Sequence, residues 1–207
     1  TKAYIASESA MASVAACPTS MCAPNAKWVM WDTPFSIRET KKRDDGFLGY
    51  ETNIGGFATG LSRMLDSNTA IGLAVGYDYR KMKGRDGYYS KNNADTFHAA
   101  LYGGTNIGHF FIDGYAGYSR SWNRTERDIV AIGGGFEQRN KANYNDTVLS
   151  AGLKVSYVWI LPNDVRITPS IGADFSHVRS GSFREKSNTT TANLIRADSA
   201  SYSTLAM

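Results

Sequence analysis

The alternation of apolar residues with small or polar ones is clearest in residues 69–80. The odd positions there are Thr69, Ile71, Leu73, Val75, Tyr77 and Tyr79, and the even positions are Ala70, Gly72, Ala74, Gly76, Asp78 and Arg80. Successive side chains of a β-strand point to opposite faces, so this segment predicts a strand with one bulky apolar face and one small face that becomes charged. Such a strand suits a barrel wall whose bulky face meets lipid and whose small face lines a lumen. A strand of a soluble sandwich or barrel fits this one segment equally well.

The same period of two recurs along the rest of the chain, in segments of roughly ten residues, which is the length of a transmembrane β-strand. With residues 69–80 as the third, the predicted strands are residues 28–35, a segment that ends near Leu61, residues 96–104, 110–120, 149–159 and 165–176, and a segment that begins near Ile195. The sequence therefore predicts eight strands and an all-β fold.

The connections between these strands alternate in length. They are short after the second, fourth and sixth strands (residues 65–68, 105–108 and 161–164) and long and polar after the first, third, fifth and seventh (residues 37–46, 81–95, 122–147 and 179–194). Short turns at one rim and long loops at the other are typical of an antiparallel up-and-down outer-membrane β-barrel. Aromatic residues also gather near strand ends, as the interfacial girdles of such barrels require: Trp28, Trp31, Phe35, Tyr77, Tyr79, Tyr118, Trp122, Tyr157 and Trp159. Together these features favour a membrane barrel over a soluble β-protein.

Residues 3–16 differ from everything that follows. They are rich in Ala and Ser, contain no Gly or Pro, and predict a slim α-helix that Pro18 and Pro24 close. A helix with such small side chains fits inside a narrow tube, and it fits equally well as an arm packed on a surface.

Several motifs, taken in order, resemble the translocator domain of classical autotransporters, the type V secretion proteins. The motifs are Lys-Trp-Val-Met-Trp-Asp-Thr-Pro-Phe (27–35), Gly-Phe-Ala-Thr-Gly-Leu (56–61) with Ala-Ile-Gly-Leu-Ala-Val-Gly-Tyr (70–77), Tyr-Gly-Gly (102–104) with Phe-Ile-Asp-Gly-Tyr-Ala-Gly-Tyr (111–118), residues 153–157, and Ile-Thr-Pro-Ser-Ile-Gly (167–172). Each is weak alone, and the resemblance rests on the ordered set, which covers residues 28–207.

The resemblance implies a barrel of twelve strands with an α-helix threaded through its lumen. It divides the chain into a linker helix and connector (residues 1–26) and an incomplete autotransporter β-barrel (residues 27–207). The chain departs from the family pattern because eight strands are counted, and because Met207 is not the aromatic residue that usually ends an outer-membrane insertion signal. Two interpretations stay open: a truncated barrel, which we favour, or a barrel that closes with eight strands. Closure with eight leaves room only for side chains and excludes a threaded helix.

Composition and charge exclude other classes. No run of eighteen apolar residues exists, which excludes a helical membrane span, and the net charge of +4 is spread among acidic residues, which argues against nucleic-acid binding. Cys17 and Cys22 have no His nearby and form a poor zinc site, so we expect a local disulfide or two free thiols. The basic loop at Arg38 and residues 41–43 has the charge to touch lipopolysaccharide phosphates, but two Asp follow it directly, which favours a plain solvated loop.

No catalytic constellation is evident. Asp174, Ser176 and His177 are too close along an extended strand to form a triad, and Gly133-Gly134-Gly135 lacks the Lys and Ser or Thr of a phosphate loop. Some members of the resembled family release their passenger by cleavage between adjacent Asn in the helix. The one Asn-Asn pair, at 92–93, lies in a predicted loop, so that activity is not supported. We expect no enzyme activity, no cofactor and no metal.

The candidate functional surface is the set of residues with lumen parity: Ala74, Gly76, Asp78, Arg80, His98, Asp113, Lys154, Arg166 and Asp174. There are two interpretations of their charged side chains. Either they hydrate a pore, or they form ion pairs whose only role is to stabilise the barrel wall. The leading hypothesis is a translocator and anchor in the bacterial outer membrane, with long loops extracellular and short turns periplasmic. The resemblance implies as partners a passenger segment, outer-membrane lipid and lipopolysaccharide, the barrel-assembly machinery and periplasmic chaperones. The alternatives are a small closed eight-stranded barrel whose loops bind a partner, as in an adhesin, and, with little support, a rim enzyme.

Overall fold

The computed structural model describes residues 27–42, 49–84, 90–130, 137–162, 165–189 and 194–207. The predicted helix at residues 3–16, with Cys17 and Cys22, lies outside these residues. No helix among the described residues is long and apolar enough to cross a membrane.

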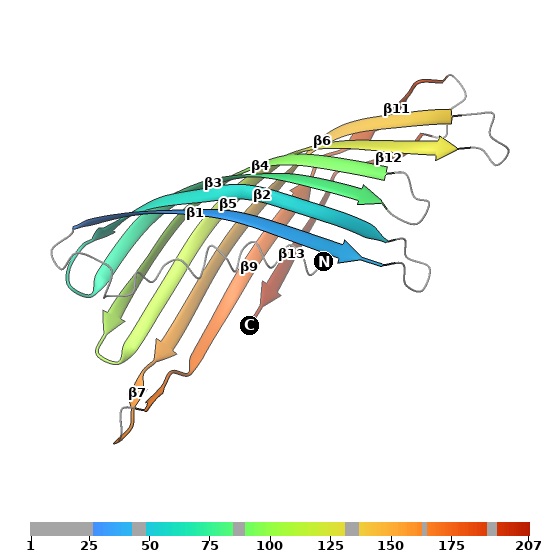
Figure 1. The fold of residues 1–207 in the computed structure, drawn as a ribbon. Coiled ribbons are helices and arrows are strands. Elements are labelled where there is room, and N and C mark those ends of the chain that lie inside the picture. The colour runs from blue at the N-terminus through green and yellow to red at the C-terminus, as the bar shows by residue number, and fades with distance from the viewer. Residues whose placement is uncertain (1–26, 43–48, 85–89, 131–136, 163–164, 190–193) are drawn as a thin grey trace.

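The chain forms one large antiparallel meander in which each strand pairs with its neighbours in sequence (Figure 1). Its long strands are β1 (Trp28–Lys41), β2 (Tyr50–Met64), β3 (Thr69–Gly84), β4 (Ser90–Ile107), β5 (Phe110–Val130), β6 (Glu137–Tyr157), β9 (Ser170–Ser180) and β13 (Ala200–Ala206). Five two-residue strands continue these at the rims: β7 (Trp159–Ile160), β8 (Arg166–Ile167), β10 (Phe183–Arg184), β11 (Lys186–Ser187) and β12 (Arg196–Ala197). The prediction of an all-β antiparallel fold is confirmed, and each of the eight long strands overlaps a segment that the alternation predicts. Residues 159–160 and 166–167 leave the predicted strands and form the separate pair of β7 and β8.

The strands reach much further toward the long-loop rim than the sequence predicted. The loop predicted at residues 122–147 is mostly strand, because β5 runs to Val130 and β6 begins at Glu137. The loop predicted at 81–95 shrinks in the same way, since β3 ends at Gly84 and β4 begins at Ser90. Apolar alternation stops before these extensions, so a rule based on hydrophobic period ends the strands too early. Charged and hydroxyl side chains paired across the strands support them instead.

The cross-strand register places an apolar band on one face of the sheet. Phe110 of β5 lies opposite Tyr157 of β6, and Tyr118 lies opposite Leu149. The face between these pairs carries exposed apolar side chains on both strands, and the exposed Leu73 and Val75 of β3 continue the band at the same level. The span from Phe110 to Tyr118 matches the length that a tilted strand needs to cross hydrocarbon.

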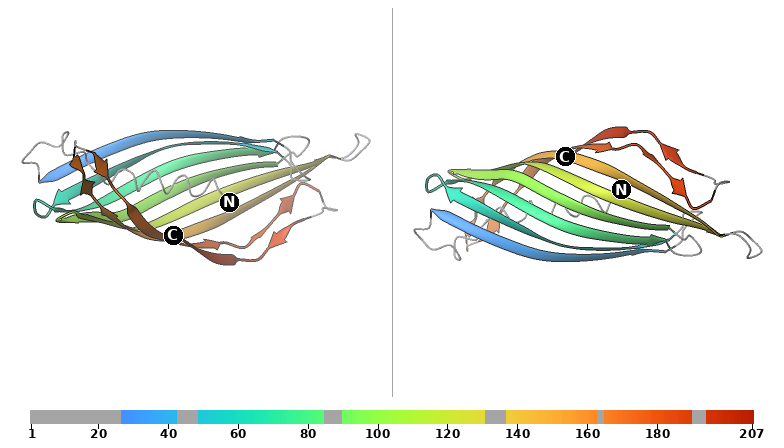
Figure 2. Two further views of the ribbon diagram at one scale, coloured as in Figure 1. Left: turned by 90° about the horizontal axis from the view of Figure 1, so that it is seen from below. Right: turned by 90° about the horizontal axis from the view of Figure 1, so that it is seen from above.

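The sheet is strongly curved, as Figures 1 and 2 show. Trp31 of β1 donates a hydrogen bond from Nε1 to Tyr102 Oη of β4 at 2.6 Å, although β2 and β3 lie between the two strands. In a flat sheet those strands would be roughly 14 Å apart, so the two rings meet only because this face is concave. The apolar band therefore lies on the convex face.

The two lateral edges of the sheet are open. Within the described residues, β1 pairs with β2 alone and β13 pairs with β9 alone. The wall curves but does not close on itself through these strands.

A β-bulge interrupts the register between β6 and the segment that follows β9. Asp146 lies opposite Ser180, and five residues earlier on β6 Lys141 lies opposite Lys186, six residues beyond Ser180. The extra residue falls next to Gly181, whose N–H donates to Asn145 O at 2.8 Å. A Cβ at Gly181 would lie 2.9 Å from that same oxygen, so glycine is the residue that fits.

Candidate functional site: the concave polar face

Glycines make space on the concave face for two large aromatic rings. The ring of Trp31 lies over Gly60 and that of Tyr102 over Gly72, and a Cβ on either glycine would overlap the ring. Tyr102 Oη also lies 2.6 Å from Ser62 Oγ, so the two rings and the hydroxyl form one polar bridge across β1, β2 and β4. The sequence placed Trp31 in a membrane girdle, whereas its side chain faces the concave side.

The predicted lumen residues of β3 lie on this concave face. Ala74 is buried, Gly76 faces the same side, and Asp78 and Arg80 follow at the same parity toward the long-loop rim. The convex neighbours Leu73 and Val75 are exposed by 65% and 45%, which separates the two faces clearly.

Two polar chains cross the concave face near the middle of the strands. In the first, His98 Nε2 lies 2.6 Å from Asp78 Oδ2, and His98 Nδ1 lies 2.8 Å from Ser119 Oγ. These three side chains come from β3, β4 and β5.

The second chain is longer and runs across β3, β5, β6 and β9. Arg80 Nη2 donates to Asn123 Oδ1 at 3.0 Å, and Asn123 Nδ2 donates to Asp146 Oδ2 at 2.8 Å. Ser180 Oγ donates to the other oxygen of Asp146 at 2.5 Å. Asn123 is almost fully buried, and a buried amide with both ends hydrogen-bonded fixes the relative position of the strands that it joins.

The Ser119–His98–Asp78 arrangement lacks the remaining parts of an acyl-transfer site. An oxyanion hole needs backbone N–H groups that are free to point at the substrate. Here β4 is paired on both sides by β3 and β5, and β5 on both sides by β4 and β6, so the ladders use the backbone donors around Ser119. The geometry favours a structural polar bridge.

Nearer the short-turn rim, a hollow of about 320 Å³ collects three of the predicted lumen residues. Lys154 Nζ lies 3.7 Å from Asp113 Oδ2, and Tyr115 Oη donates to Asp174 Oδ1 at 2.9 Å. Gly152 lies between Tyr115 and Asp174, where a Cβ would overlap both. Arg166 is not part of this group, because it lies in β8, which pairs with β7 outside the main sheet.

At the long-loop rim a buried ion pair joins β5 to the segment between β10 and β11. Arg127 Nη2 donates to Glu185 Oε2 at 2.6 Å and Arg127 Nε to Oε1 at 3.1 Å, while Asn140 Nδ2 and the Ile195 N–H also donate to Oε2. Burial alone would raise the pKa of Glu185. The hydrogen bonds from Arg127 and the Ile195 N–H outweigh burial, and the pKa lies below the ordinary glutamate value.

The sequence reasoning did not single out Tyr102, Asn123, Asp146 or Glu185 as site residues. The parity of Tyr102 could have been read from its predicted strand, whereas Asn123 falls in the loop predicted at residues 122–147. Their partners could not have been read in this way, because pairing across strands depends on the register of the whole sheet.

Comparisons with known proteins agree with this geometry. The family model of the autotransporter β-domain matches residues 30–207. Outer membrane protein B of Rickettsia japonica is 26% identical over 175 residues, which are 82% of this chain and 10% of that protein. Outer membrane protein A of Rickettsia rickettsii is 25% identical over 174 residues, which are 80% of this chain and 8% of that protein. The chain thus spans about a tenth of the length of these relatives.

Two solved structures share the fold. The translocator domain of the autotransporter NalP from Neisseria meningitidis superimposes with a TM-score of 0.76 at 14% identity, over 99% of this chain and 67% of that one. The β-domain of the Bordetella autotransporter BrkA gives a TM-score of 0.53 at 18% identity, over 84% of this chain and 66% of that one.

Proposed function

Because the chain belongs to the autotransporter β-domain family, a transport component of the bacterial outer membrane, we propose that it anchors a passenger polypeptide there and forms part of the pore through which that passenger is secreted. The observation that carries the proposal is the concave face. It is lined by small side chains and by hydrogen-bonded polar groups, which keep water in a lumen and give a passing chain little apolar surface to adhere to.

The described strands supply a large part of the barrel wall. Open edges at β1 and β13 leave backbone N–H and C=O groups that must be paired in a membrane, since no water is available there. Additional strands of the same barrel are the expected partners, in line with a family barrel of twelve strands. The eight-stranded closed barrel requires β1 to pair with β13, and the described residues do not pair in that way.

The predicted helix at residues 3–16 has a place in this arrangement, inside the lumen as the link between passenger and wall. The proposed orientation puts the short turns in the periplasm and the rim with Glu185 outside the cell. The proposed partners are the passenger itself, outer-membrane lipid with lipopolysaccharide, periplasmic chaperones, and the barrel-assembly machinery during insertion. The proposed role needs no catalytic group and no cofactor.

A pair of variants on adjacent residues tests the pore. Ala74→Trp places a large ring on the concave face, and Leu73→Trp places the same ring on the convex face one residue away. We expect Ala74→Trp to lower surface display of the passenger at least about fivefold, because a ring fills space that a passing chain needs, and Leu73→Trp to change it by less than about twofold. Display is measured by protease access to a passenger tag in intact cells, using the protein as its gene encodes it.

Folding is checked by the shift in gel mobility between unheated and heated samples. Equal display for both variants, with both barrels folded, would contradict passage along the concave face.

A further inference from the structure

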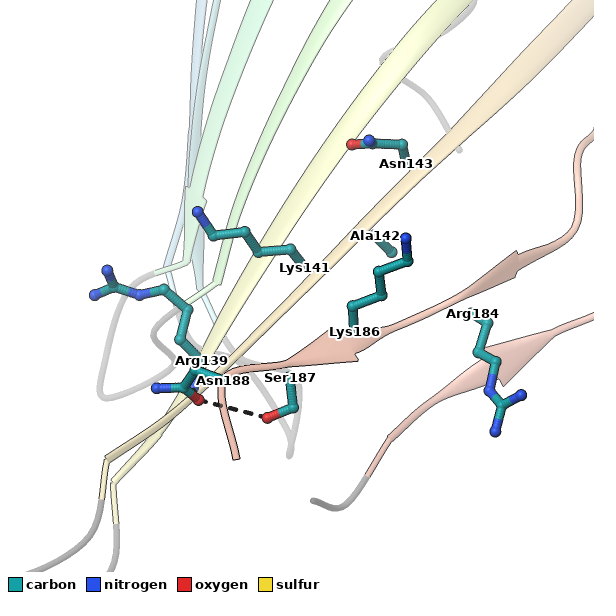
Figure 3. Close-up of a pocket in the computed structure, with 8 residues that line it drawn as sticks. All are labelled: Arg139, Lys141, Ala142, Asn143, Arg184, Lys186, Ser187 and Asn188. Carbon is teal, nitrogen blue, oxygen red and sulfur yellow. Dashed lines mark hydrogen bonds between the residues drawn. The ribbon is translucent and has the colours of Figure 1, made fainter. Parts of the chain in front are cut away.

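A cationic pocket lies on the convex side of the sheet, beyond the apolar band, between β6 and the segment from β10 to β11. Its described lining is Arg139, Lys141, Ala142, Asn143, Arg184, Lys186, Ser187 and Asn188, around a cavity of about 750 Å³. Four of these side chains are cations and none of those described is a carboxylate. In Figure 3, Lys141 and Lys186 extend from adjacent strands in different directions, Arg139 lies beside Lys141, and Arg184 points away.

The register places two lysines opposite each other at this pocket. Lys141 lies directly opposite Lys186 across the antiparallel ladder, and like charges in such positions destabilise a sheet. Lys141 is balanced by Glu126 Oε1 at 2.8 Å, and Arg139 by Asp128 Oδ1 at 2.8 Å. Lys186 has no carboxylate within ion-pair distance among the described residues. An anion bound between Lys141 and Lys186 would remove this repulsion.

The same row of the sheet continues this positive charge. Lys91 of β4 lies opposite Lys83 of β3 on one side and Glu126 of β5 on the other. Glu126 in turn lies opposite Lys141, and Glu51 of β2 lies opposite Lys83, so the row reads Glu51, Lys83, Lys91, Glu126, Lys141, Lys186 from β2 to β11. Four lysines against two glutamates leave this row with a net positive charge, which attracts anions along the convex surface.

The height of the pocket identifies the kind of anion. Trp122, the last outward aromatic of β5, lies opposite Asn145, and Lys141 is four residues further along β6. Four residues of a strand tilted by about 45° rise roughly 10 Å. A phospholipid headgroup layer is only about 5–8 Å thick, so its phosphates lie too low. The anion that fits this level is a phosphate carried on a membrane sugar head that stands above the headgroup layer.

We propose that this pocket binds the phosphate groups of the sugar head of lipopolysaccharide in the outer leaflet, with Lys141, Lys186 and Arg139 as the contacting cations. The proposal rests on the proposed orientation, in which this rim faces the cell exterior. The exposed convex side gives a membrane glycolipid access that a ligand in the lumen would not have. The cavity is also large enough for a phosphorylated sugar.

The test measures binding of fluorescently labelled bisphosphorylated lipid A to the purified full-length protein in detergent. Lys186→Glu is the test variant. Arg38→Glu is the matched control, because Arg38 is an exposed cation of β1 at the same side of the band, outside the pocket, and it also has an ion pair, 2.9 Å from Glu51. We expect Lys186→Glu to weaken binding at least about tenfold and Arg38→Glu to change it by less than about twofold. Dephosphorylated lipid A should bind weakly and equally to all three proteins.

Stability gives a second readout that a folding defect cannot mimic. Lys186→Glu replaces a lysine pair by a lysine–glutamate pair, so without lipid its thermal midpoint should rise. Lipid A should further stabilise the wild type and Arg38→Glu but not Lys186→Glu. Unchanged binding in Lys186→Glu, or an equal loss in Arg38→Glu, would overturn the proposal. Competition by inorganic pyrophosphate as strong as that by unlabelled lipid A would overturn the lipid as the ligand. Since binding is measured on purified protein, failure of the display experiment would leave this result unaffected.

Discussion

Glu185 is the single residue on which the long-loop rim depends most. Its carboxylate accepts four hydrogen bonds from β5, β6 and the backbone of Ile195, and it is only 5% exposed. Removing one member of a buried ion pair leaves the other charge without compensation, at a cost of about 3 kcal/mol. Glu185→Gln should therefore open the contact between β10 and β12, measured as faster hydrogen exchange of the Ile195 amide.

The pH dependence follows from the lowered pKa of Glu185. Because the folded-state pKa lies below the unfolded value of about 4.5, the stabilisation is complete at neutral pH and is lost as the pH falls below that value. The protection of the Ile195 amide, relative to its intrinsic exchange rate at each pH, should fall in that acidic range for the wild type and show no such step for Glu185→Gln. Glu126→Gln is the control, since its pair with Lys141 is exposed and its loss costs less than about 1 kcal/mol. Identical exchange in Glu185→Gln and the wild type would refute this role.

For a single residue, the sequence predicts the face of the sheet on which its side chain lies, but not the side chain that it contacts. The parity of residues 69–80 placed Asp78 and Arg80 on the face that proves to be concave. Their partners, His98 and Asn123, come from other strands, 20 and 43 residues away. Those contacts depend on the register of three strands at once, and no local pattern encodes it.

Among the elements, the bulge at Gly181 decides how the long-loop rim is built. One extra residue there shifts the segment after β9 along β6, which brings Lys186 opposite Lys141 and places Glu185 on the concave side. Gly181→Val should clash with Asn145 O and cost about 1–3 kcal/mol. We expect β11 to separate from β6, measured as faster exchange of the Asn188 amide, which donates to Arg139 O.

Gly55→Val is the matched control, because a Cβ at Gly55 meets nothing within 4 Å. If both valine variants slow or speed exchange at Asn188 equally, the bulge has no special role in holding β11.

Element boundaries show where a hydrophobic pattern stops being informative. The pattern located the membrane-spanning part of β5 and β6, since the uninterrupted run of outward apolar positions ends at Tyr118 and Leu149. Beyond these residues both strands continue with charged pairs such as Asp128–Arg139, at 2.8 Å. These pairs stabilise strands by cross-strand contact and leave no apolar period, so their extent could not be predicted.

For the whole molecule, the decisive question is whether β1 and β13 meet. A variant with Asp32→Cys and Thr59→Cys joins two residues that lie opposite each other on β1 and β2, and it should form a disulfide in the membrane-inserted protein. A variant with Asp32→Cys and Ser203→Cys tests β1 against β13. We expect no crosslink in the second pair, because further strands separate those edges in the proposed barrel.

Both pairs are introduced with Cys17 and Cys22 replaced by Ser, and the crosslink is read from gel mobility with and without reductant. An efficient Asp32→Cys/Ser203→Cys disulfide would establish the closed eight-stranded barrel instead.

The meander topology also bears on the order in which this protein can assemble. Among the long strands, each pairs only with the long strands next to it in the sequence, so no strand has to enter between two that are already joined. Contacts of this kind close short loops first, which keeps the entropic cost of each step small. The sheet can therefore grow one hairpin at a time from either lateral edge. Each added strand exposes a new open edge like the edge that it covers. The sheet of eight long strands therefore corresponds to one step of such growth.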